Sequence, residues 1–113
     1  MEKYWEGAAV FPATGTEVEY FVDAGPDGVT DANRRSLATI VSNYDALLDQ
    51  ARAVVETLEP DDRPRGLLRL SSVDIPGAPL EAASWELGFC DADEKLFSVL
   101  YSGLTATGLV EKS

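Results

Sequence analysis

The sequence has no histidine and only one cysteine, Cys90. Histidine is the usual general acid–base group near neutral pH and a common ligand in catalytic zinc and iron sites. Nucleophilic triads that pair serine or cysteine with histidine are therefore excluded. A lone cysteine forms no internal disulfide, which fits a reducing cytoplasm. These absences favour a non-enzymatic protein and give no reason to expect a metal ion or another cofactor.

Basic residues are also few, because nine Lys and Arg stand against twenty Asp and Glu, for a net charge of −11. An acidic surface repels nucleic-acid phosphates and anionic membranes, and it attracts basic proteins. The sequence has no run of about 20 apolar residues that could span a bilayer, and its first residues lack the pattern of a secretory signal. We therefore expect a cytoplasmic protein with a basic protein partner, although solubility alone also accounts for the charge.

The residues that are present suffice for a hydrophobic core. Of the 113 residues, 45% are apolar, and a chain of this length buries roughly two-thirds of its unfolded surface. No linker or low-complexity tract divides the sequence. The length and composition predict a single compact domain over residues 1–113.

The N-terminal part predicts a β-hairpin followed by one long helix. Trp5–Phe11 and Glu17–Asp23 have the pattern of strands, and Gly25–Gly28 forms a strong turn after them. Thr30 or Asp31 can cap the helix, and Pro60 stops it. Its apolar residues recur at helical spacing over about seven turns: Leu37, Ile40, Val41, Tyr44, Leu47, Leu48, Ala51, Val54, Val55 and Leu58.

After Gly66 the sequence predicts four more strands. These are Leu67–Ile75 with a bulge near Ser71 and Ser72, Ser84–Cys90, Leu96–Tyr101 and Leu104–Val110. The predicted fold is α+β with two layers, in the order ββαββββ. One long amphipathic helix packs on one face of an antiparallel sheet of about six strands, which leaves the other face open.

The open sheet face is the candidate binding surface. In the second strand Val18, Tyr20 and Val22 alternate with side chains that would point away from the helix, and the later strands alternate in the same way. The residues expected on the open face are Glu17, Glu19, Phe21, Asp23, Glu86, Leu96 and Leu100. Apolar side chains ringed by acids resemble a recognition surface for a basic partner, but scattered exposed apolar residues are also ordinary.

Three further features are candidate sites. Asp91–Glu94 lacks the spacing of a calcium loop and is expected to be a solvated turn. The acids from Glu56 to Asp62 show no sign of a buried catalytic pair, so a hydrolase that uses carboxylates alone is the least favoured function. Cys90 points outward with no cation next to it in sequence, which favours an unreactive strand residue.

The strand Trp85–Phe89, the acidic turn after it and the strand that begins at Leu96 complete a layout that resembles small acidic bacterial protein families of unknown function. Some members of such families resemble immunity proteins, which bind and block a cognate toxin. The resemblance implies a non-enzymatic inhibitor of a basic bacterial partner. The alternative is a self-associating structural or regulatory domain that buries Phe21 and Leu100 in a homodimer.

Overall fold

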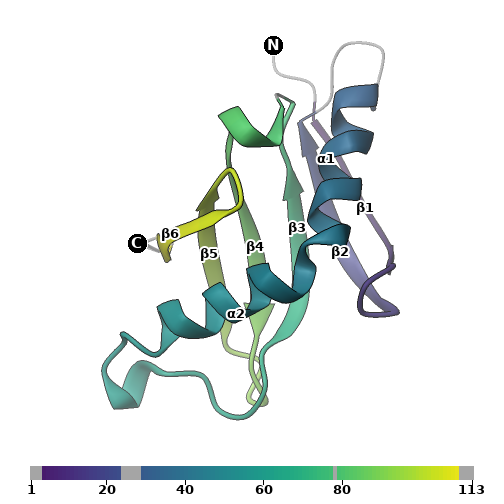
Figure 1. Ribbon diagram of the computed structural model, residues 1–113. Helices are drawn as coiled ribbons and strands as arrows, with labels where there is room; N and C mark the ends of the chain where they lie inside the picture. Colours follow the sequence, from purple (N-terminus) through teal and green to yellow (C-terminus); the bar gives the residue numbers. More distant parts are fainter. Residues whose placement is uncertain (1–3, 24–28, 78, 110–113) are drawn as a thin grey trace.

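The computed structural model describes residues 4–23, 29–77 and 79–109. Six strands form one sheet, and their order in the sheet follows their order in the chain (Figure 1). The strands are β1 (Tyr4–Phe11), β2 (Thr16–Asp23), β3 (Arg69–Ile75), β4 (Ser84–Cys90), β5 (Leu96–Ser102) and β6 (Thr105–Leu109). The other elements are the helices α1 (Asp31–Ser42) and α2 (Tyr44–Val55) and the short 3₁₀ helices η1 (Pro60–Asp62) and η2 (Leu80–Ala82). The α+β class and the six strands are confirmed, with strand ends within two residues of those predicted.

The sheet is mixed, so the prediction of an antiparallel sheet is wrong in one place. β2 and β3 run parallel, with Glu19 opposite Ser72, whereas the other neighbouring pairs are antiparallel. The two helices carry the chain back across one face of the sheet, so β3 starts at the same end as β2. The predicted hairpin of β1 and β2 and the predicted bulge in β3 are confirmed, the latter as a register shift between Leu70 and Ser72.

The predicted single helix is also wrong, because the chain forms two helices that meet at Asn43. The Asn43 side chain donates a hydrogen bond to the Thr39 carbonyl at 2.8 Å, and its backbone leaves helical geometry at φ −111° and ψ 12°. A side chain that bonds nearby backbone in this way competes with the helix. Figure 1 shows the result: α1 follows β2 and β3, and α2 turns to cross the sheet toward β6.

The start of α1 is fixed to the sheet by a buried polar side chain. Thr30, one of the two capping residues that the sequence offers, caps the helix and forms a capping box with Asn33. Asn33 is 1% exposed, and its amide also donates to the carbonyls of Asp23 and Pro76. One side chain therefore joins the helix start to the ends of β2 and β3. The turn predicted at Gly25–Gly28 lies outside the described residues.

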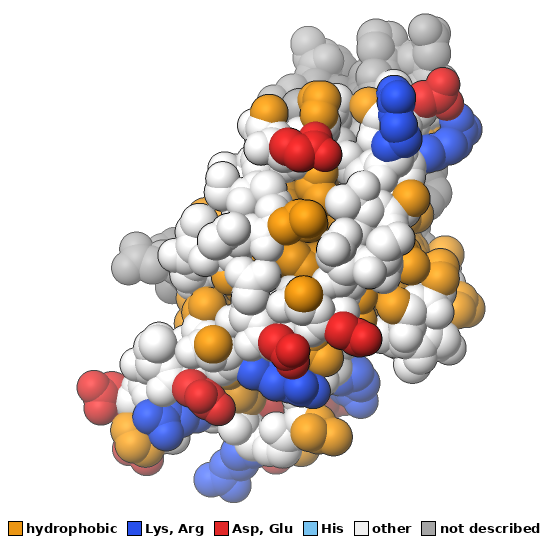
Figure 2. Space-filling view, viewed as in Figure 1, with side chains coloured by type: hydrophobic (Ala, Val, Ile, Leu, Met, Phe, Trp, Pro, Cys, Tyr) orange, Lys and Arg blue, Asp and Glu red, His pale blue; other side chains and the backbone are white. Residues whose placement is uncertain are grey.

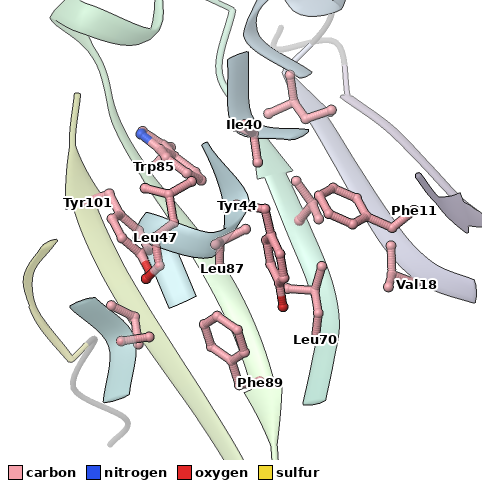
Figure 3. Close-up of a cluster of buried hydrophobic side chains, with 14 of the residues drawn as sticks. Phe11, Val18, Ile40, Tyr44, Leu47, Leu70, Trp85, Leu87, Phe89 and Tyr101 are labelled. Atoms are coloured by element: carbon pink, nitrogen blue, oxygen red, sulfur yellow. The ribbon is translucent and has the colours of Figure 1, made fainter. Parts of the chain in front are cut away.

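The core lies between the helices and one face of the sheet (Figure 3). Its fully buried members include Ile40 and Leu47 from the helices and Leu87 from β4. Aromatic pairs lie at both sides of this cluster: Phe11 meets Tyr44 edge-on at 5.2 Å, and Trp85 stacks on Tyr101 at 4.8 Å. No helix in the described part of the chain is long and apolar enough to cross a membrane.

Candidate binding face

The strands divide their side chains between two faces with opposite character. Facing the helices, β2 contributes Val18, Tyr20 and Val22, all at most 6% exposed, and β4 and β5 contribute equally buried residues. We call this side the helix face. The other side, which no described helix covers, is the open face. Its side chains on β2 to β5 are half-buried or exposed except for Cys90: Glu17, Glu19, Phe21, Asp23, Ser72, Asp74, Glu86, Gly88, Cys90, Leu96, Ser98 and Leu100.

An acidic row with apolar ends crosses the middle of the open face. Phe21 lies opposite Asp74 on β2 and β3, and Glu86 lies opposite Leu100 on β4 and β5. Burial raises the pKa of the Asp74 carboxyl from 3.8 to about 6, and the negative charges of Glu86 and Asp23 act in the same direction. The backbone N–H of Glu86 opposes the shift. The row therefore concentrates negative charge where water only partly screens it.

Next to this row the surface of the open face is recessed, because residues with small side chains lie opposite one another on neighbouring strands there. Ser72 pairs with Gly88, and Gly88 pairs with Ser98. A Cβ atom at Gly88 would overlap the Ser72 hydroxyl, so the Ser72 side chain occupies the space that glycine leaves. These three residues form a shallow floor beside the acidic row.

A hollow of about 380 Å³ lies on the other side of that floor, lined in part by Glu17, Glu19, Arg69 and Cys90. The Arg69 guanidinium donates a hydrogen bond to the Cys90 sulfur at 3.1 Å. Cys90 is only 6% exposed, because Arg69 lies across it from β3. No cation is next to Cys90 in sequence, as stated above, but β3 brings one to it from a distant position in the chain.

All seven residues predicted for the open face lie on it, but they fall into separate groups. Phe21, Asp23, Glu86 and Leu100 belong with the acidic row, whereas Glu17 and Glu19 line the hollow. Leu96 stands apart at the start of β5, 56% exposed and opposite Cys90. Asp74 was missed by the sequence reasoning. The available signal was that Asp74 follows Val73 directly, so the two side chains point to opposite faces of β3. The bulge earlier in β3 obscured this alternation of faces.

In the turn after β4, Ala92, Asp93 and Glu94 are exposed as predicted. Asp91 is not, since it is only 3% exposed. Its carboxylate accepts hydrogen bonds at 2.9 Å from the backbone N–H groups of Arg65, Asp93 and Lys95. The Arg65 bond is the main reason that the pKa of Asp91 lies below its usual range. Asp91 therefore fastens the β4–β5 turn to the segment before β3. Across the described residues there is no group of three or more His, Cys, Asp or Glu that could hold a metal ion.

The helix side of the molecule is more mixed in character. Figure 2 shows apolar side chains in a band beside α1, with acidic and basic side chains together at the lower end of α2. A hollow of about 490 Å³ separates α1 from η2 and is lined in part by Ala32, Thr39 and Leu80. Its lining includes both Arg35 and Glu81, so it lacks the single sign of charge that marks the acidic row.

Comparisons with known proteins found no relative of this chain. No protein-family model, no curated protein and no solved structure matches the chain. The resemblance to small acidic bacterial families stays a prediction, and function has to be argued from the open face itself.

Proposed function

We propose that the chain is a non-enzymatic binding module whose open face takes a basic protein partner. The observation that carries this proposal is the acidic row, in which Asp74 and Glu86 lie between Phe21 and Leu100, with the charge of Asp23 acting on Asp74 from β2. Like charges held at a partly buried site are unfavourable in the free protein. A lysine or arginine from a partner would relieve that repulsion, and the two flanking side chains offer apolar contact area.

The most specific form of the proposal is an immunity-like inhibitor of a basic bacterial toxin. It rests on the sequence resemblance and on the charge of −11. Electrostatic attraction between such partners speeds association and weakens as salt is added. Self-association through the same face is the alternative, and exposed Leu96 and Val10 on that face favour it.

The test begins with capture of proteins from a lysate of the source organism at low and high salt, followed by mass spectrometry. The captured protein is then purified, and its Kd is measured with wild type and two double variants. One variant, Asp74→Asn with Glu86→Gln, removes two charges from the acidic row. The control, Glu56→Gln with Glu59→Gln, removes two charges from exposed residues after α2.

We expect the acidic-row variant to weaken binding about tenfold and the control to change it less than about twofold. Equal losses in both variants would contradict a localised site, because they would show that only the total charge matters. A salt-resistant homodimer with no captured protein would favour self-association.

A further inference from the structure

The two edges of the sheet differ in how well they are protected. An edge strand carries backbone N–H and C=O groups that point away from the sheet and can pair with another chain. β1 and β6 are the two edges in the sheet order. Natural proteins protect such edges with short strands, bulges, proline, charged side chains or a covering element, so each edge can be compared against these devices.

The β6 edge is protected in several ways. It has five residues, and its register with β5 shifts between Leu100 and Tyr101. The Gln50 side chain on α2 accepts a hydrogen bond from the Ala106 N–H at 2.7 Å and donates one to the Leu104 carbonyl at 2.8 Å. A helix side chain therefore satisfies backbone groups at this end of the strand, and those groups are not available to a further strand.

Within residues 4–23, 29–77 and 79–109, the β1 edge has almost none of these devices. It has eight residues, and all eight pair with β2 in unbroken register. Residues 4–11 contain no proline, lysine or arginine, and Glu6 is their single charged residue. Ala8, Ala9 and Val10 are exposed. Among the strands that the structure describes, β2 is the one neighbour of β1.

We infer that the β1 edge takes an extended segment of a basic partner as a seventh strand, with lysine or arginine at every second residue. This inference rests on the proposed function, and it names the binding mode that the function would use. Strand addition draws its affinity from main-chain hydrogen bonds and its specificity from alternate side chains. A strand as long as β1 spans about 27 Å.

Charge decides which occupant fits. Residues 4–23 contain no lysine or arginine and four acids: Glu6, Glu17, Glu19 and Asp23. Glu6 lies on the open face of β1, opposite Phe21, and Glu17 and Glu19 lie opposite Val10 and Ala8. Strands lie about 4.8 Å apart, so basic side chains on an added strand would lie within about 10 Å of all three glutamates, near the screening length at physiological salt. A second copy would instead bring its own charge of −11.

On the helix face, an added strand would lie beside uncharged residues of β1. Gly7 and Ala9 face the helix side of β1 and lie opposite Tyr20 and Val18. Gly7 has no side chain and that of Ala9 is small, so these two positions add little bulk beside apolar side chains of the incoming segment. The preferred segment therefore alternates basic residues on the open face with apolar residues on the helix face.

The test uses the full chain, a capped peptide as long as β1 that alternates lysine with valine, and a control peptide with glutamate in place of lysine. Backbone amide shifts locate binding, and the titration gives Kd. Ala9→Lys places a charge on the β1 edge, which is a natural block to strand pairing. Thr107→Lys makes the same charge change on β6, where Thr107 is exposed.

We expect the lysine peptide to shift β1 amides, Ala9→Lys to weaken its binding about tenfold, and Thr107→Lys to leave the Kd within about twofold of wild type. Binding to the acidic row without β1 shifts would overturn this inference and leave the proposed function standing. No binding of the lysine peptide, or equal binding of both peptides, would also overturn it. A concentration-dependent dimer abolished by Ala9→Lys would show that the edge takes a second copy instead.

Discussion

The two faces of the sheet are made by the same strands, yet they differ in almost every physical property. On the helix face, Val73, Leu87 and Val99 are fully buried. On the open face the adjacent residues Asp74 and Glu86 are acidic and only partly buried. One face therefore holds the fold together, and the other tolerates charge that the fold does not need. Mutations on the two faces should separate stability from binding.

The largest contrast is between leucines on opposite sides of the sheet. Leu47 has no exposed area in the core, whereas Leu96 on the open face is 56% exposed. We expect Leu47→Ala to lower the free energy of unfolding by about 2–5 kcal/mol and Leu96→Ala to lower it by less than about 1 kcal/mol. Urea denaturation of both variants measures this. Equal losses would mean that Leu96 belongs to a core that the described residues do not show.

A second contrast concerns two aspartates in opposite environments. Asp91 is surrounded by three backbone N–H donors, and its lowered pKa means that its charge stabilises the folded protein above pH 4. We expect Asp91→Ala to cost stability between the losses of the two leucine variants. Asp93→Ala, in the same turn but more exposed, is the control. Loss of stability on acidification through the low pKa of Asp91 should be absent in Asp91→Ala.

Phe21 tests whether a half-buried aromatic residue on the open face belongs to folding or to binding. We expect Phe21→Ala to lower stability by less than about 2 kcal/mol, because its ring is not enclosed by the core. The same variant should weaken partner binding more than Leu96→Ala does, since Phe21 adjoins the acidic row. Thermal melts followed by circular dichroism, together with Kd measurements, check both statements. A larger loss of stability would assign Phe21 to the core.

The smallest expected effect is a gain in stability. The pKa of Asp74 is raised to about 6, so the folded state binds this proton more tightly than the unfolded state does. Stability from this group is therefore present below about pH 4 and lost as pH rises through 6. Asp74→Asn should stabilise the protein at pH 8 by about 1 kcal/mol, after allowance for solvent screening, and change little at pH 4. Urea denaturation at both pH values measures the difference, and destabilisation at pH 8 would contradict it.

Much of this arrangement could be predicted from the sequence, because strand alternation is a local property. The alternation in β2 predicts both faces. Its apolar residues Val18, Tyr20 and Val22 lie on the helix face, and the residues between them lie on the open face. The helix break was not predictable from periodicity, since Tyr44 and Leu47 continue the apolar stripe of Ile40. The break lies at Asn43, where the side-chain amide bonds to the Thr39 carbonyl and the backbone leaves helical geometry.

The features that depend on distant residues were missed. The parallel pairing of β2 and β3 depends on the end of the sheet at which the helices bring the chain back. The alternation of side chains in β2 does not show which strand pairs with it or in which direction. The burial of Asp91 likewise depends on Arg65, which lies far from it in sequence and supplies one of its three donors. The cation beside Cys90 comes from Arg69 for the same reason.

The parallel β2–β3 pair has a consequence for how the sheet assembles. It joins Glu19 to Ser72, whereas the antiparallel pairs join strands that a short connection separates. Closing so long a loop costs entropy before the new contacts repay it. We therefore expect β3 to β6 to assemble first and the β1–β2 hairpin to be the last part of the sheet to dock. A partner strand on β1 would then pair with the part of the sheet that docks last.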